Sequence, residues 1–388
     1  MDVSPVGVLA LDRVEAAVLM AALAAAATAA LPVQERSVPE FRAYVRVIRL
    51  DVSVVDRRGQ PITGLTPSDF VVLENGRPVD ITFFEAVQGD AAAGVEATTD
   101  SAVVSVPPPR RILLLVDAGA MSHGQLIRTR QSVARYLRES AAEGDWVRLV
   151  NLSSAHAWDG RIPMDRELLL SAAQRLARRG SPWAAASGET AGSLHDPIED
   201  HTETEGGPGR PSESVTSGQF LSAFAQGVGV LGVVESLLMQ LDGLEGRKAL
   251  VLLSPGFPQM RGLDDILQRV ASLARQSATA VYFVDAAGLD GLVPEPFRRL
   301  PPAFEGAWSR SGGAQDLAEA TGGFVSRFSN SLWPALQRVG AEMKTYYVIG
   351  YAPLRQDDGR FRSVKVKVSV PGASARTKKG YLAGPRRR

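Results

Sequence analysis

Residues 111–117 read RILLLVD, five consecutive apolar residues between an arginine and an aspartate. A continuous apolar run of this length is typical of a strand that is buried on both faces, as in a parallel sheet covered by helices. We therefore expect a strand that places Asp117 at the carboxyl edge of a sheet. Open α/β folds bind their ligands at that edge.

Strands and helices alternate around this run, through residues 110–351. Apolar periodicity predicts helices at about 124–142, 165–178, 220–241, 263–277 and 332–343. The interleaved strands are GDWVRLVNL (144–152), KALVLLSPG (248–256), ATAVYFVDA (278–286), GGFVSRF (322–328) and TYYVIGYAP (345–353), with a short hairpin at 155–164. This alternation predicts an α/β domain with a doubly wound, mostly parallel sheet.

Two stretches interrupt the alternation. Residues 180–217 are rich in Gly, Ser, Glu and Pro and lack periodicity, so we expect a long mobile insertion. Residues 286–312 contain four prolines and are expected to form a second loop.

The flanking segments carry β patterns. Residues 41–87 predict an N-terminal β module with a hairpin at Asn75-Gly76, and 88–109 a linker that ends in three prolines. Residues 352–384 alternate apolar and polar side chains and predict a C-terminal hairpin. Neither piece has enough strands to be stable alone, so the hairpin is expected to pack on the N-terminal module as a small β-sandwich.

The N-terminal segment 1–31 predicts export. Arg13 precedes an alanine-rich apolar run that ends near a small-x-small site, Ala27-Thr28-Ala29, as in a secretory signal peptide. Asp2 and Asp12 depart from the usual basic start. A retained anchor and an alanine-rich amphipathic helix are the alternatives. We expect a periplasmic, envelope or extracellular protein whose membrane contact is limited to this segment.

Composition excludes several classes of site. The 388 residues include 43 basic and 42 acidic ones, which argues against a broad nucleic-acid surface. There is no cysteine, so disulfides, thiolate chemistry and cysteine zinc sites are excluded. The four histidines, His123, His156, His195 and His201, have no metal-binding spacing. No cofactor is expected.

The motifs also carry a resemblance. RILLLVDAGAMS (111–122) resembles the first strand and loop of a von Willebrand factor type A domain. From Phe41 to Leu382 the chain resembles the bacterial von Willebrand A-related proteins described from acidobacteria, through VSVVDRRGQPITGLTPSDFVVLENG (52–76), YYVIGYAP (346–353), DGRFRSVKVKV (358–368) and KKGY (378–381), in that order. The resemblance implies a Rossmann-like von Willebrand A fold in the central domain.

The resemblance also implies a place where a metal site is to be sought. Many A domains hold Mg²⁺ with Asp-x-Ser-x-Ser after the first strand, a Thr from a later loop and a further Asp. This chain keeps Asp117 but has Gly119 and Met121 in place of the two serines, and neither supplies an oxygen ligand. Ser122 is one residue out of register, and Thr216 is a candidate for the threonine.

The further aspartate of that pattern is replaced as well, by Ser254-Pro255-Gly256. We therefore expect a degenerate site without metal. An alternative role for Asp117 is structural, accepting hydrogen bonds from loop amides or capping the next helix.

The sequence thus predicts a non-enzymatic, exported interaction or adhesion module that binds a protein partner. The candidate binding residues at the sheet edge are Asp117, Ser122, Thr216 and Ser254, and no catalytic residues are expected. A magnesium-dependent adhesion domain with an irregular site is the first alternative. A hydrolase using Ser122, His123 and Asp117 is the second, although the chain has no GxSxG elbow.

Overall fold

The computed structural model describes residues 47–89, 91–92, 109–154, 156–177, 213–256, 262–291, 312–355 and 357–384, with the backbone alone at 91–92, 213–223 and 290–291. These residues all belong to one compact unit that runs from Arg46 to the C-terminus. The predicted signal or anchor at 1–31, most of the predicted linker at 88–109, and His195 and His201 lie outside these ranges.

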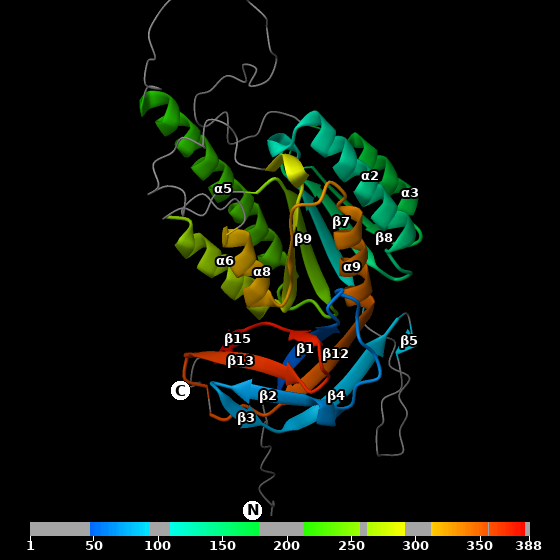
Figure 1. Ribbon diagram of the computed structural model, residues 1–388, viewed down its shortest axis with the longest axis vertical. Helices are drawn as coiled ribbons and strands as arrows, with labels where there is room; N and C mark the ends of the chain where they lie inside the picture. The colour runs from blue at the N-terminus through cyan, green and yellow to red at the C-terminus, as the bar shows by residue number, and fades with distance from the viewer. Residues whose placement is uncertain are drawn as a thin grey trace, which may run out of the picture. The chain divides into compact units, whose positions relative to one another are not determined.

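The centre of the fold is a six-stranded sheet with the order β11-β10-β9-β6-β7-β8 (Figure 1). Its strands are β6 (Arg111–Val116), β7 (Trp146–Asn151), β8 (His156–Arg161), β9 (Lys248–Ser254), β10 (Thr279–Asp285) and β11 (Val325–Ser326). Neighbouring strands are parallel except for β8, which runs antiparallel to β7. The predicted α/β fold with a doubly wound, mostly parallel sheet is therefore confirmed.

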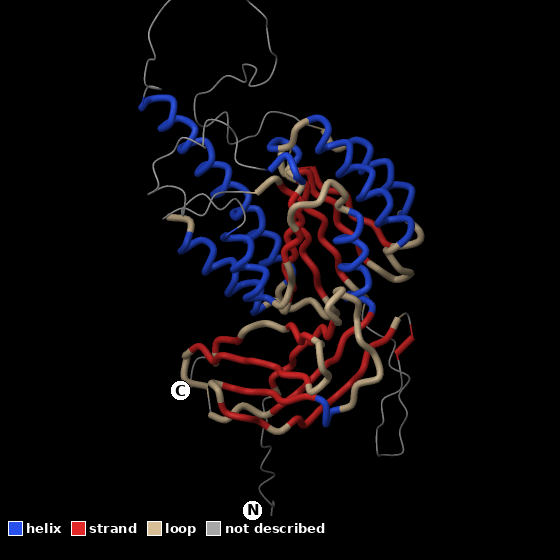
Figure 2. Tube along the Cα trace, in the orientation of Figure 1, coloured by secondary structure: helices blue, strands red, loops and turns tan. Residues whose placement is uncertain are grey.

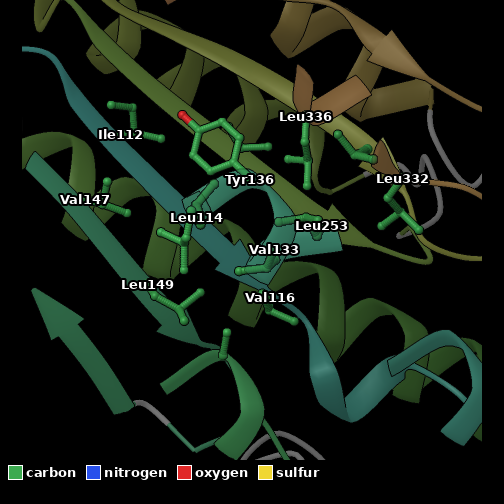
Figure 3. Packing of buried hydrophobic residues seen from close by; sticks show 14 of the residues in the cluster. Ile112, Leu114, Val116, Val133, Tyr136, Val147, Leu149, Leu253, Leu332 and Leu336 are labelled. Carbon is green, nitrogen blue, oxygen red and sulfur yellow. The ribbon is translucent and has the colours of Figure 1, made fainter. Parts of the chain in front are cut away.

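Helices cover both faces of this sheet. The helices α2 (His123–Glu139), α3 (Arg166–Arg175) and α9 (Trp333–Lys344) cover one face. The helices α5 (Glu213–Leu241), α6 (Asp264–Gln276) and α8 (Gly312–Thr321) cover the other. Because side chains alternate along a strand, β6 sends Ile112, Leu114 and Val116 to the first face and Leu113 and Leu115 to the second. Figure 3 shows the first set packed with Tyr136 of α2 and Leu336 of α9.

The N- and C-terminal segments form a β-sandwich from two antiparallel sheets (Figure 2). One sheet has the order β14-β1-β12-β4-β5 and the other β15-β13-β2-β3. Their bounds are β1 Ile48–Val55, β2 Phe70–Glu74, β3 Arg77–Val79, β4 Ile81–Gln88, β5 Ala91–Ala92, β12 Thr345–Tyr351, β13 Phe361–Val368, β14 Ser374–Arg376 and β15 Gly380–Leu382. The C-terminal strands were predicted to pack on the N-terminal module, and the structure joins them by direct pairing of β13 with β2 and of β14 with β1. Both sheets contribute to one buried core.

The strand at 345–351 differs from the prediction, which put it in the α/β domain. β12 lies between β1 and β4 in the antiparallel sheet, so the α/β domain ends with α9 at Lys344. The sequence could not reveal this, because a strand buried on both faces has the same apolar pattern in either kind of sheet.

Two other expectations are corrected. Residues 213–217, assigned to the insertion, form the start of α5, whereas 178–212 lie outside the described residues. Helix α8 was not predicted. It is ten residues long and begins with two glycines, so its helical signal is weak.

The helix α5 is long and apolar enough to cross a membrane, judged by length and composition alone. Within the described residues it is the one helix that qualifies, through the 18-residue window Phe224–Leu241 with a mean hydropathy of 1.4. Its Val230, Leu231 and Val234 are fully buried in the core on the α6 and α8 face of the sheet. A helix buried in a protein core can have the same length and apolar composition as a membrane-spanning helix.

Buried polar contacts join the sandwich to the helical domain. The carboxylate of Glu342, fully buried on α9, forms ion pairs with Arg376 of β14 and with Arg338, whose Nε lies 2.9 Å from it. Arg247, just before β9, donates to the hydroxyl of Ser53 in β1 at 2.7 Å. The backbone of Thr377 approaches Gly322 so closely that a Cβ there would lie 2.8 Å from it, so this position requires glycine.

Candidate functional site

The candidate site lies at the carboxyl ends of β6 and β9. These adjacent strands flank the point where the strand order reverses, the usual ligand position in open α/β sheets. Asp117 follows β6 and Ser254 is the last residue of β9. The Asp117 amide donates to the carbonyl of Leu253 at 3.0 Å, which continues the strand pairing up to the edge.

The carboxylate of Asp117 is turned into the protein. The residue is 4% exposed, and its Oδ2 accepts hydrogen bonds from Ser254 Oγ at 2.8 Å and from Gln226 Nε2 of α5 at 3.1 Å. Burial raises the pKa of Asp117, and the hydrogen bonds from Ser254 and Gln226 offset only part of that rise. The group is therefore held by three elements, the loop after β6, strand β9 and helix α5.

Ser254 is fully buried, and its hydroxyl both donates and accepts a hydrogen bond. While it donates to Asp117, its Oγ accepts the Gly256 amide at 3.0 Å. The sequence placed Asp117 and Ser254 at one edge, and the structure brings them into direct contact. The structural role suggested for Asp117 is present in part: its carboxylate accepts a hydrogen bond from the Ala120 amide of the following loop, whereas its side chain makes no cap bond to the short 3-10 helix η2 (Ala118–Ala120).

Ser122 follows the loop after β6 and begins the next helix. It is exposed and is the N-cap of α2, where its Oγ accepts the Gln125 amide at 3.3 Å and its own amide donates to Gln125 Oε1 at 2.9 Å. This reciprocal capping box starts the helix. Among the described residues, the hydrogen bonds of the Ser122 side chain and amide are with Gln125, whereas the Asp117 carboxylate is bonded to Ser254 and Gln226.

The two residues that replace the expected serines differ in burial. Gly119 is half-buried in η2 at the edge. Met121 is 1% exposed and belongs to the apolar core beneath α2, where Thr129 Oγ1 lies 3.5 Å from its sulfur. The backbone therefore points residue 121 away from the edge.

The remaining candidate and its neighbours come from other elements. Thr216 lies within the first turns of α5, where only the backbone is described. Asn151 ends β7 at the same edge, and its Oδ1 accepts the Ser153 amide at 3.1 Å. Sequence reasoning missed Gln226 as a partner of Asp117. It is the only residue with a polar side chain between Phe224 and Val234, which was the available signal.

The oxygen atoms of Asp117 and Ser254 are not suited to bind a magnesium ion. Mg²⁺ requires octahedral coordination by oxygen, with charged carboxylates among the ligands. Here one carboxylate is buried with a raised pKa, and the one hydroxyl beside it is engaged on both sides. Among the described residues no group of three or more His, Asp or Glu side chains is placed to hold a metal.

Two apolar side chains are exposed at the same edge of the sheet. Leu289 lies in the 3-10 helix η3 (Gly288–Gly291) after β10 and is 56% exposed, and Phe328 follows β11 and is 67% exposed. Asn330 joins their loops, because its Oδ1 accepts the Leu289 amide at 2.9 Å. Phe328 has a φ of 57°, a left-handed conformation that costs a bulky residue energy.

No family model and no curated protein matches this chain. Among solved structures it is similar to the manganese-loaded TRAP protein of Plasmodium vivax, with 10% identity over 77% of this chain and 84% of that one, at a TM-score of 0.28. Similarity at this level does not inform the chemistry of the site.

Proposed function

We propose that this chain is a non-enzymatic, exported protein-interaction module that docks a protein partner at the carboxyl edge of its α/β sheet. The observation that carries the proposal is the inward-facing Asp117, whose carboxylate is held by Ser254 at 2.8 Å and Gln226 at 3.1 Å. These hydrogen bonds fix the loop after β6, which in a metal-binding A domain would hold the ion. The edge therefore offers a preformed surface rather than a metal or a reactive group.

The apolar pair at this edge supports a protein as the partner. Leu289 and Phe328 expose more than half of their surface, and Asn330 ties one of their loops to the other. Exposed apolar side chains on fixed loops are the usual anchors of protein interfaces, with aromatic residues prominent among them. The strained backbone at Phe328 is consistent with a side chain kept for binding rather than for folding.

Affinity capture with matched variants tests this docking surface. Immobilised protein is exposed to an envelope fraction and bound proteins are identified by mass spectrometry. Leu289→Ala combined with Phe328→Ala should lose a partner that wild type retains. The control is Met164→Ala, which removes a 76% exposed side chain from the turn between β8 and α3. If wild type captures nothing specific, or the double variant captures the same protein equally well, the edge is not the docking surface.

The proposal also holds that the loop containing Asp117 binds no metal ion. Calorimetric titration of wild type and Asp117→Ala with Mg²⁺ and Mn²⁺ should give no saturable heat in either protein. A saturable signal in wild type that disappears in Asp117→Ala would instead support the magnesium-dependent alternative.

Export is also part of the proposal, based on the apolar segment before Leu31 and the small residues at 27–29. Expression of the full chain in a bacterial host, followed by fractionation and N-terminal sequencing, tests it. We expect an envelope or periplasmic product that begins near residue 30. A cytosolic product that keeps its first residues would contradict export, and an uncleaved membrane-bound product would support an anchor.

A further inference from the structure

A second feature of the α/β domain lies between α2 and α3. A cavity of about 340 Å³ opens there, lined by Arg130, Gln131, Ala134, Arg138 and Gln174. Four of the five are on α2 and Gln174 is on α3. Its volume is within the range of small-ligand sites. Four of its five lining residues have polar end groups, although their apolar stems and Ala134 make up most of the exposed lining.

The lining follows from helical spacing. Arg130, Ala134 and Arg138 are four residues apart and therefore form one stripe along α2. The small side chain of Ala134 leaves space between the two arginines, two turns apart. Both guanidinium groups consequently border the same cavity.

The two arginines are held differently. Arg130 donates from Nε to the Leu176 carbonyl at 2.8 Å and also from Nη2, so its guanidinium is anchored at the C-terminal end of α3. The Arg138 guanidinium makes no hydrogen bond and no ion pair with the residues that the structure describes. One cation is thus preorganised, and the other is available to a ligand.

The surrounding helices are basic. The sequence of α2 contains four arginines and one glutamate, and that of α3 contains two arginines and one glutamate. Glu139, the acidic residue of α2, is paired with Arg135 at 3.0 Å. Neither glutamate lines the cavity.

We propose that this cavity is a binding site for a phosphate-type oxyanion. Guanidinium groups match such anions with paired N–H donors, and the amides of Gln131 and Gln174 add neutral donors beside them. Arg130 and Arg138 supply the charge from two sides, and Ala134 forms the floor. The site does not depend on Asp117 or on a partner at the carboxyl edge, so it goes beyond the proposed function.

Calorimetric titration of the full chain with inorganic pyrophosphate at low salt tests the site. Wild type should bind saturably, and Arg138→Gln should weaken binding at least about tenfold, which corresponds to about 1.4 kcal/mol. Arg269→Gln is the matched control. It removes the same charge from an exposed position on α6, on the opposite face of the sheet, and should change affinity less than about twofold. Thermal unfolding of both variants should match wild type, because neither change removes a buried contact.

A second arm identifies the source of the anion. Vesicles of phosphatidylglycerol, with phosphatidylcholine vesicles as the neutral reference, are sedimented with the same three proteins. Dependence on Arg138 in the pyrophosphate arm indicates a soluble phosphate compound, and dependence in the vesicle arm alone indicates a lipid headgroup. If binding depends on Arg138 in neither arm, or falls equally with Arg269→Gln, the cavity is not an oxyanion site.

Discussion

Ser254 donates its hydroxyl hydrogen to Asp117 at 2.8 Å across the point where the strand order of the α/β sheet reverses. The bond joins the ends of two adjacent parallel strands. Gln226 of α5 donates a second hydrogen bond to the same carboxylate oxygen. The carboxylate therefore acts as an internal acceptor that fixes the edge, instead of a ligand offered to solvent.

Replacing Ser254 by alanine should destabilise the protein by about 1–3 kcal/mol, because a buried carboxylate loses a donor and the Gly256 amide loses an acceptor. Urea unfolding followed by circular dichroism measures the change. The reference is Ser363→Ala, which removes an exposed hydroxyl that lies 3.3 Å from Asn75 Oδ1 and should cost less than about 0.5 kcal/mol. Equal losses in the two variants would show that the Asp117 contact contributes little.

Asp117→Asn should change how stability depends on pH. Burial raises the folded-state pKa of Asp117 above its ordinary value of 3.8, so the folded state binds the proton more tightly than the unfolded state. This contribution is fully present below the ordinary value and is lost as the pH rises through the folded-state pKa. Asparagine does not titrate, so the variant should gain stability relative to wild type as the pH rises above 3.8 toward the folded-state pKa. Urea unfolding across this range measures the difference, and parallel curves would contradict it.

Met121→Ser should not create a metal ligand, although it introduces one of the serines of the magnesium pattern. Because Met121 is 1% exposed in the core, the shorter polar side chain should cost about 2–5 kcal/mol. Met121→Leu conserves volume and should cost less than about 1.5 kcal/mol. Thermal unfolding with and without Mg²⁺ separates the outcomes, since stabilisation of Met121→Ser by the ion would contradict the buried position.

Phe328→Asn should stabilise the protein while weakening docking at the edge. Asparagine tolerates the left-handed backbone better than phenylalanine, and the 67% exposed ring has little packing to lose, so a gain of up to about 1 kcal/mol is expected. Differential scanning calorimetry measures stability, and the capture experiment measures docking. A loss of stability would show that the ring packs in the fold.

Arg376→Gln should weaken the connection between the sandwich and the helical domain. It removes one of the two cations that neutralise the fully buried Glu342 and should cost about 3 kcal/mol. Lys379→Gln, which breaks an exposed pair with Glu319 at 2.8 Å, should cost less than about 1 kcal/mol. Urea unfolding provides both values. A similar small loss in the two variants would mean that Arg338 alone neutralises Glu342.

Much of this fold could be predicted because its signals are periodic. The apolar run at 112–116 gave the central strand and its direction, so Asp117 and Ser254 could be placed at one edge. The alternation of valines in 364–370 predicted a strand, and the shortage of strands at each end predicted that the two ends pack together, as the pairing of β13 with β2 shows. The position of β12 could not be predicted, since its pattern does not distinguish the two sheets.

The details of the site depended on side-chain direction, which periodicity does not provide. Met121 and Ser122 are neighbours in sequence, yet one is buried in the core and the other is an exposed helix cap. Gln226 reaches Asp117 from a helix more than a hundred residues away. The lone polar side chain in the apolar stretch 224–234 singles out Gln226, but the sequence does not identify its partner.

The sandwich pairs N-terminal strands with C-terminal strands, and this imposes an order on folding. β2 at Phe70–Glu74 pairs with β13 at Phe361–Val368, so a ribosome has made nearly the whole chain before the two can meet. Contacts of such long sequence separation form slowly, because the intervening loop must close first. The parallel sheet can form earlier from its own contiguous segments. We expect the nascent chain to pass through a stage in which the helical domain is folded and the unpaired N-terminal strands await the C-terminus.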